Sequence, residues 1–307
     1  MCIRDRFTID RDHTAIECRR WLPDVAPHGT VQIVHGAAEH CARYDRVAAA
    51  LTTAGFAVYA HDQRGHGRTA DLHGTLGVAR PGGFTAMVAD AAAIADHIEG
   101  AHPGRPIVLM GHSMGSFVAQ AFAQRWGDRL AGLVLSGTSG GLEGGVELRE
   151  MLAGIEVAEG PDAPSAVWTA MTAGFNEAFD EPTATGSEWL SRDPAEVRAY
   201  VDDPWCGHDL SNGFVTDLVG AMVELWTPDA ESGLREGLPV LMIAGDADPV
   251  GGEGALVRAL ADRYTSRGLG PVSLRLYPGA RHEVLNETNR DEVTEDLLDW
   301  LNGVVPR

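Results

Sequence analysis

The chain of 307 residues contains no lysine, so all 24 of its cationic side chains are arginines, against 44 aspartates and glutamates. Without lysine the chain can form neither a lysine Schiff base nor the Gly-Lys pair of a Walker-A phosphate-binding loop. The net charge of −20 repels phosphate backbones and anionic lipids. We therefore expect no nucleic-acid partner.

Cysteine is scarce and dispersed, and long apolar runs are missing. The four cysteines form no C-x-x-C pair, which disfavours a disulfide scaffold or a zinc ribbon and favours free thiols in a reducing cytoplasm; they are Cys2, Cys18, Cys41 and Cys206. No run approaches the roughly 18 apolar residues of a membrane span, so we expect no integral membrane association. The segment 1–6 lacks the apolar part of a signal peptide, and we expect an extension with little role in the fold.

Short apolar runs alternate with longer amphipathic ones, which is typical of an open α/β sheet. Strands are expected at 31–34, 57–60, 107–110, 133–135, 240–243 and 272–277, after an antiparallel pair at 7–9 and 16–21. Most of these runs lack in/out alternation, which suits parallel strands covered on both faces. Helices are expected at 46–54 and 84–99, each ended by a glycine, and at 291–301.

The alternation stops between about Gly137 and Gly237, where four apolar helical stripes replace the strands. Such stripes pack an insertion onto a main domain. Four of the seven tryptophans lie in this segment, and a helical insertion rich in Trp, Met and Phe could also roof an apolar pocket. We therefore expect a core at 7–136, a helical cap at 137–237 and a second part of the core at 238–307.

The segment Gly111-His-Ser-Met-Gly115 is a G-x-S-x-G motif between the strand expected at 107–110 and an apolar helical stretch. A nucleophile elbow requires this strand–turn–helix context. The turn is so tight that the residues flanking the serine must be nearly free of side chains. The motif predicts that Ser113 is the nucleophile of a serine hydrolase.

A serine nucleophile needs a base that a third group orients. In this type of site the chain order is Ser, then acid, then His, and of the 12 histidines only His282 follows the strand at 240–243. The loop 245–250 offers two acids. We favour Asp248, which Pro249 fixes in the loop, and assign Asp246 to a turn or cap.

The oxyanion that develops in acyl transfer needs preorganised donors, usually two backbone N–H groups. We expect one from Met114, the residue after the nucleophile. The other is expected from Ala37, in the loop 35–40 after the third strand, where Gly36 lets the backbone approach.

Three segments, His35-Gly-Ala-Ala-Glu-His-Cys-Ala-Arg-Tyr44, Asp62-Gln-Arg-Gly-His-Gly-Arg68 and Gly111-His-Ser-Met-Gly-Ser116, together resemble the monoacylglycerol lipase/lysophospholipase-like α/β-hydrolases. These enzymes are grouped with the serine aminopeptidase-type hydrolases. The resemblance spans most of the chain after residue 7. It implies an α/β-hydrolase fold with a mostly parallel central sheet flanked by helices, and a helical cap inserted after the sixth strand. It also implies triad roles for Ser113, Asp248 and His282, oxyanion donors Ala37 and Met114, and no cofactor.

The substrate expected from this resemblance is a small carboxylic ester whose apolar acyl group lies beneath the cap, such as a monoacylglycerol, a lysophospholipid or a short-chain ester. In the lipase branch, the Glu and Arg of the first segment lie near the glycerol headgroup, which would make Glu39 and Arg43 substrate-binding residues. Alternatively, these two residues pair with each other and brace their loop. The cap determines the substrate and is the part that the resemblance constrains least.

Two other functions are compatible with the same residues. An amidase or aminopeptidase would bind a free ammonium through acids, for which the insertion offers Glu143, Glu147, Glu150 and Glu156. A non-catalytic binder would keep the fold without reacting. The complete set of triad and oxyanion residues disfavours the binder.

Cofactor motifs are weak. The segment Gly65-His-Gly-Arg-Thr-Ala70 formally satisfies a dinucleotide fingerprint, with Asp90 twenty residues further on. Asp62 and Arg64 crowd this turn and no helix start is evident, so we expect no dinucleotide. Metal is not expected either, because the pairs His61/His66 and His208/Asp209 lack a third ligand in a zinc-type spacing. The sequence gives no basis for an oligomeric state.

Overall fold

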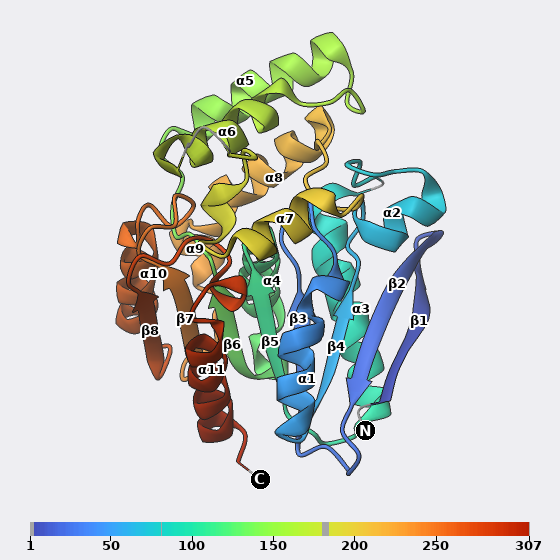
Figure 1. Cartoon of the computed structure of the whole chain (residues 1–307), viewed down its shortest axis with the longest axis vertical. Helices are drawn as coiled ribbons and strands as arrows, with labels where there is room; N and C mark the ends of the chain where they lie inside the picture. The colour runs from blue at the N-terminus through green and yellow to red at the C-terminus, as the bar shows by residue number, and fades with distance from the viewer. Residues whose placement is uncertain (1–2, 81, 180–183, 307) are drawn as a thin grey trace.

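A computed structural model describes residues 3–80, 82–179 and 184–306. Its centre is an eight-stranded sheet in the order β1-β2-β4-β3-β5-β6-β7-β8 (Figure 1). The strands are β1 Ile3–Arg11, β2 Thr14–Leu22, β3 Gly29–Val34, β4 Phe56–His61, β5 Ile107–His112, β6 Leu130–Ser136, β7 Val240–Gly245 and β8 Val272–Tyr277. The pairs β1–β2 and β2–β4 are antiparallel, and the other pairs are parallel. The predicted mostly parallel α/β sheet is confirmed.

Helices cover both faces of the sheet. Helices α1 and α11 pack on one face, and α3, α4 and α10 on the other (Figure 1). The helices are α1 Asp45–Thr53, α2 Gly67–His73, α3 Gly83–Ala101, α4 Met114–Trp126, α5 Gly145–Glu159, α6 Ala166–Asn176, α7 Pro194–Asp202, α8 Asn212–Leu225, α9 Pro228–Glu231, α10 Ala255–Ser266 and α11 Arg290–Val304. Because both faces are covered, nearly every residue of β3 to β7 is buried, as expected for parallel strands without alternation.

Helices α5 to α9 lie between β6 and β7 in the chain, and α5 to α8 form a layer over one end of the sheet (Figure 1), whereas α9 packs beside α10 through the ion pairs of Glu231 with Arg263 and Arg267. Local sequence explains where they begin. Asp193 caps α7 by accepting from the Ala195 N–H, and Pro194 occupies the first turn. Ser165 and Ser211 cap α6 and α8 in the same way. The layer therefore stands above the carboxyl ends of the parallel strands, where loops from the core gather.

Two expectations about the ends of elements are wrong. Strand β1 begins at Ile3, so residues before Phe7 belong to the sheet, where Asp5 accepts two hydrogen bonds from Arg20. Helix α3 continues through Gly100 to Ala101 instead of stopping at Glu99. A glycine lowers helix stability by only about 1 kcal/mol, which the packing of a long buried helix offsets.

The glycine-rich segment after β4 also differs from expectation, because a helix does begin there, at Gly67. Its N-terminus is already occupied by the chain's own carboxylate. Asp62 Oδ2 accepts from the Arg68 N–H at 2.9 Å, and a Cβ at Gly67 would lie 2.6 Å from the same atom. This position, where a dinucleotide fingerprint would hold a phosphate, is thus filled by Asp62.

A buried ion pair between Arg64, which follows β4, and Asp90 on α3 also holds the β1–β2 hairpin. The Arg64 side chain is 1% exposed, and its guanidinium donates to both carboxylate oxygens of Asp90 on α3, at 2.6 and 3.1 Å. It also donates to the Arg11 carbonyl and to Thr14 Oγ1. The pair therefore fixes the edge of the sheet against α3.

Replacing Asp90 by alanine removes the bidentate partner of a buried guanidinium, and we expect the free energy of unfolding to fall by about 3 kcal/mol. Asp96→Ala on the same helix is the control, because Asp96 is exposed where it pairs with Arg129. That change should cost less than about 1 kcal/mol. Urea unfolding measures both, and equal losses would contradict the role given to Asp90.

Candidate active site

Ser113 occupies a turn between β5 and α4 that forces an unusual backbone conformation. Its φ is 51° and its ψ −124°, outside the regions that residues with side chains normally adopt. A Cβ at Gly111 would lie 2.2 Å from the Gly115 carbonyl oxygen, and a Cβ at Gly115 would lie 2.2 Å from the Val34 carbonyl oxygen. Both flanking glycines are thus sterically required, which agrees with the reason given for them in the sequence.

His282 and Asp248 meet at the same edge of the sheet. His282 follows β8, and its Nδ1 lies 3.0 Å from both carboxylate oxygens of Asp248, which follows β7. The Val250 N–H donates to Asp248 Oδ1 and fixes the carboxylate. Asp246 instead is exposed and accepts from the Gly279 N–H at 2.6 Å. The structure therefore brings Asp248, and not Asp246, to the imidazole.

The environment of His282 favours its charged form. Burial of the ring opposes protonation, but the charge and hydrogen bond of Asp248 outweigh burial, and the pKa of His282 is raised above its usual value. Because Nδ1 faces Asp248, Nε2 is the atom left to exchange a proton with a nucleophile. Ser113 and His282 line one cavity, although no hydrogen bond joins them within the described residues.

Two backbone amides border the same cavity beside Ser113. Met114 is the first residue of α4, so its N–H has no acceptor inside the helix and carries the positive end of the helix dipole. Ala37 lies in the loop after β3, where the preceding Gly36 N–H is taken by Glu39 Oε1. Both predicted oxyanion donors line the cavity next to the serine.

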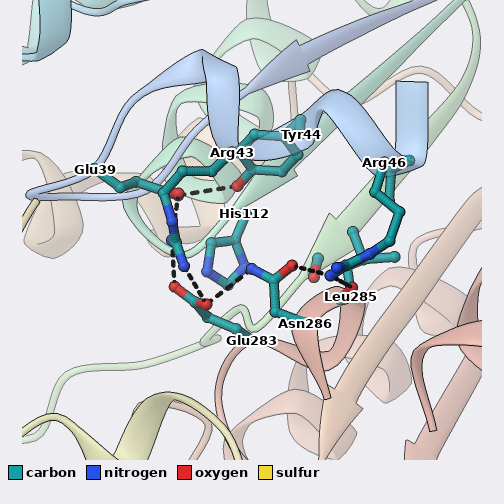
Figure 2. A pocket seen from close by; sticks show the side chains of 10 residues that line it. Glu39, Arg43, Tyr44, Arg46, His112, Glu283, Leu285 and Asn286 are labelled. Atoms are coloured by element: carbon teal, nitrogen blue, oxygen red, sulfur yellow. Dashed lines mark hydrogen bonds and ion pairs between the residues drawn. The ribbon is translucent and has the colours of Figure 1, made fainter. Parts of the chain in front are cut away.

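Glu39 and Arg43 pair with each other, and Glu283 completes the group (Figure 2). Glu39 accepts from the Gly36 N–H at 2.5 Å and from Tyr44 at 2.9 Å. Arg43 donates to Glu39 at 2.8 Å and to both oxygens of Glu283, at 2.5 and 2.7 Å. Arg43 thereby ties the loop 35–40, named the oxyanion loop because the expected donor Ala37 lies in it, to the loop of His282. Glu39 borders the large cavity, whereas Arg43 is not among its lining residues.

Charges and burial set the protonation states in this group. Burial raises the pKa of Glu39, but Arg43, His112, His35 and the Gly36 N–H together lower it to about 2. Burial and the nearby His282 lower the pKa of His112 to about 4. Glu39 is therefore charged and His112 neutral at pH 7. The centroid of the His112 ring lies 4.8 Å from that of the His282 ring, so the two rings pack against each other.

The cavity between cap and core has a volume of about 570 Å³. Its walls are mostly apolar and come from α5, α6 and α8, through Leu148, Trp168, Met171, Phe175, Leu218 and Met222. Of the four insertion acids suggested for binding an ammonium, only Glu143 lines this cavity, and Glu156 pairs with Arg80. The site is therefore suited to an apolar chain beside a reacting carbonyl.

One group of possible metal ligands stands out in the described parts of the chain. Donor atoms of His40, Asp203 and Cys206 lie within 4.8 Å of one another. His40 Nε2 already pairs with Asp203 Oδ2 at 2.9 Å, and burial raises the pKa of the Cys206 thiol, which disfavours a thiolate ligand. These contacts link the cap to the oxyanion loop.

Among the described helices, none is both long and apolar enough to cross a membrane.

Sequence reasoning singled out Ser113, Asp248, His282 and the two amides, and the structure gathers them around one cavity. It missed two contributors. Glu283 directly follows His282, but the sequence carries no signal for its contact because its partner Arg43 lies 240 residues away. His112 stands at a variable position of the G-x-S-x-G motif, so the motif carries no signal for its packing on His282.

Comparisons with known proteins show which family and which solved structures this chain is similar to. A sequence profile of the family described as serine aminopeptidase, S33, matches residues 25–289. A monoacylglycerol lipase of Mycolicibacterium smegmatis is 32% identical over 285 residues, which cover 92% of this chain and 90% of that protein. A carboxyl esterase from Bacillus coagulans, solved in complex with glycerol, superposes with a TM-score of 0.92 at 29% identity and covers 98% of this chain and 99% of its own. A lipase solved in an open form gives 0.89 at 31% identity, covering 99% and 100%.

If Glu39 braces the oxyanion loop, Glu39→Ala should lower kcat about tenfold on every ester, because a displaced oxyanion donor loses part of its effect. If Glu39 instead contacts a glycerol headgroup, KM should rise for a monoacylglycerol, whereas kcat and KM for p-nitrophenyl butyrate should not change. Steady-state kinetics with both substrates decide. Glu143→Ala, also at the cavity, is the control and should leave kcat for p-nitrophenyl butyrate within about twofold.

Proposed function

We propose that this chain, which belongs to the serine aminopeptidase S33 family and is an esterase- or lipase-like serine hydrolase, acts on monoacylglycerols and related esters with an apolar acyl group. The observation that carries the proposal is the mostly apolar cavity of about 570 Å³ that Ser113 and His282 help to line. Burial of an acyl chain against apolar walls is favourable. A cavity of about 570 Å³ lies within the range of volumes that is typical of small-molecule sites.

In the proposed mechanism, the Ser113 hydroxyl oxygen attacks the ester carbonyl carbon while His282 Nε2 accepts the hydroxyl proton. Asp248 holds the Nδ1–H and stabilises the imidazolium. The N–H groups of Ala37 and Met114 donate to the oxyanion. His282 then passes the proton to the leaving alcohol as the carbon–oxygen bond breaks, which leaves an acyl group on Ser113. Water then attacks the acyl carbon while His282 accepts its proton; the bond between this carbon and the Ser113 oxygen breaks, His282 returns the proton to Ser113, and the fatty acid leaves.

An aminopeptidase acting through the same residues is the second candidate, and the description of the matching family favours it. Such an enzyme would need an acid close to Ser113 for the substrate ammonium. Of the acids that line the cavity, Glu143 and Asp209 are exposed, and the buried Glu39 and Glu283 are already bound to Arg43. The mostly apolar lining of the cavity therefore supports the ester substrate.

A reducing cytoplasm is the compartment that we propose. The described cysteines, Cys18, Cys41 and Cys206, are all buried and free, and none forms a disulfide. Buried free thiols are compatible with a compartment that keeps cysteines reduced.

Ser113→Ala should lower kcat about 10⁶-fold and Asp248→Asn about 10⁴-fold, judged from other triads. Asp248 raises the pKa of His282, and the base must be neutral to work. In Asp248→Asn the residual activity should therefore persist to lower pH than in the wild type. Asp246→Asn is the matched control, because Asp246 caps a turn and does not contact the ring. Full activity of Asp248→Asn with loss in Asp246→Asn would reverse the assignment of the acid.

Substrate preference is tested with p-nitrophenyl esters from two to sixteen carbons, a monoacylglycerol and an aminoacyl anilide. We expect kcat/KM to rise with acyl length until the chain fills the cavity, and the monoacylglycerol to be hydrolysed. Each buried methylene contributes about 0.8 kcal/mol, a factor of about four. Faster turnover of the anilide than of p-nitrophenyl butyrate would favour the aminopeptidase.

A further inference from the structure

The loop that carries His282 is held by the cap as well as by the core. The short helix Glu188–Leu190 lies against it, and its carbonyl groups accept from the loop. The N–H groups of His282 and Glu283 donate to the carbonyls of Trp189 and Leu190, at 3.2 and 2.8 Å. The Arg281 side chain donates to the Glu188 carbonyl at 2.6 Å. The cap segment 188–190 is thus a direct support of the loop that bears the imidazole.

The Trp189 side chain extends this support to the ring itself. Its indole lies over the His282 imidazole, with ring centroids 4.9 Å apart and planes inclined by 33°. Phe175 of α6 packs against the indole, with ring centroids 5.1 Å apart, and Asn176 Oδ1 accepts from the backbone N–H of Trp189 at 2.9 Å. The cap therefore packs against the indole and holds the backbone of the segment that carries it.

The imidazole is enclosed between this indole and the core. Asp248, after β7, binds Nδ1, and His112, at the end of β5, lies under the ring. The charged groups behind His112 are Glu39 and Arg43 from the loop after β3 and Glu283 from the loop of His282 itself. Towards the cap, Arg281 donates to the Glu188 carbonyl and lies over the Phe179 ring. The contact of the cap with the imidazole itself is the indole of Trp189, and the face of an indole attracts a cation within about 6 Å of its centre.

We propose that Trp189 is a positioning residue for His282: its indole holds the imidazole in line with Asp248 and stabilises the imidazolium that forms during acyl transfer. This inference rests on the proposed function, in which His282 is the general base. It makes the base dependent on the cap, because the indole and the two carbonyls that support His282 all belong to the cap segment 188–190. The position of the cap segment 188–190 therefore sets the position of the base, while the cap as a whole also encloses the substrate.

The test compares Trp189→Leu with Trp189→Phe in the full chain. Both side chains are apolar and shield the imidazole from water, but only phenylalanine keeps an aromatic face. Trp168→Leu is the matched control, because Trp168 lines the same cavity from α6 but its ring does not pack on that of His282. NMR titration of the His282 ring, assigned with His282→Gln, gives its pKa without any turnover. Steady-state kinetics on p-nitrophenyl butyrate give kcat and KM.

We expect Trp189→Leu to titrate His282 at lower pH than the wild type and to lower kcat about fivefold, with KM for this short ester nearly unchanged. Trp189→Phe should lie close to the wild type in both measurements. Trp168→Leu should keep the pKa of His282, and because Trp168 is part of the cavity wall it should raise KM for the esters whose chain reaches it.

The inference is overturned if Trp189→Leu keeps the wild-type pKa and kcat, or if Trp168→Leu lowers the pKa equally. Near-UV circular dichroism verifies folding, and if the leucine variant does not fold, Trp189→Tyr and Trp189→Phe must both retain the wild-type pKa while Trp189→Met lowers it. Failure of the proposed function gives a different result. The wild type would then hydrolyse no ester, while the titration would still report the contact between the two rings.

Discussion

The chain reverses so tightly between β5 and α4 that the backbone on either side of Ser113 has no room for a side chain. Gly115 touches the carbonyl of Val34 at the end of β3, so the same close approach sets the start of α4 beside the loop that holds Ala37. One backbone contact therefore fixes the serine and both amides relative to one another. The conformation at Ser113, with φ of 51°, is tolerated because the parallel strands on both sides are buried and rigid.

Buried charges arrange the remaining groups around this turn. Arg43 joins Glu39, which holds the oxyanion loop, to Glu283, which adjoins His282. Such buried ion pairs add little net stability, but each partner is costly to leave alone, so they fix geometry strongly. Asp248 acts similarly on the imidazole, at 3.0 Å. The cap adds the final side of the enclosure through Trp189, and it also supplies the apolar walls against which an acyl chain would lie.

Local rules account for what the sequence predicts well. Apolar runs locate the buried strands, the two glycines locate the turn at Ser113, and chain order leaves His282 as the one candidate base. The start of the edge strand β1 escapes prediction because Arg4, Asp5 and Arg6 are charged and the strand lies at the border of the sheet. The contacts of Arg43 with Glu283 and of Trp189 with His282 join distant segments. Periodicity carries no information about such pairs, because the placement of the loops and the cap creates them.

The most direct test of the central claim, that Ser113 is an activated nucleophile, is intact-protein mass spectrometry after reaction with an alkyl fluorophosphonate, followed by peptide mapping. We expect a single covalent adduct per chain, located on Ser113, which forms much more slowly when His282 is replaced by glutamine. A folded protein that forms no adduct, or an adduct on another residue, would contradict the role given to Ser113.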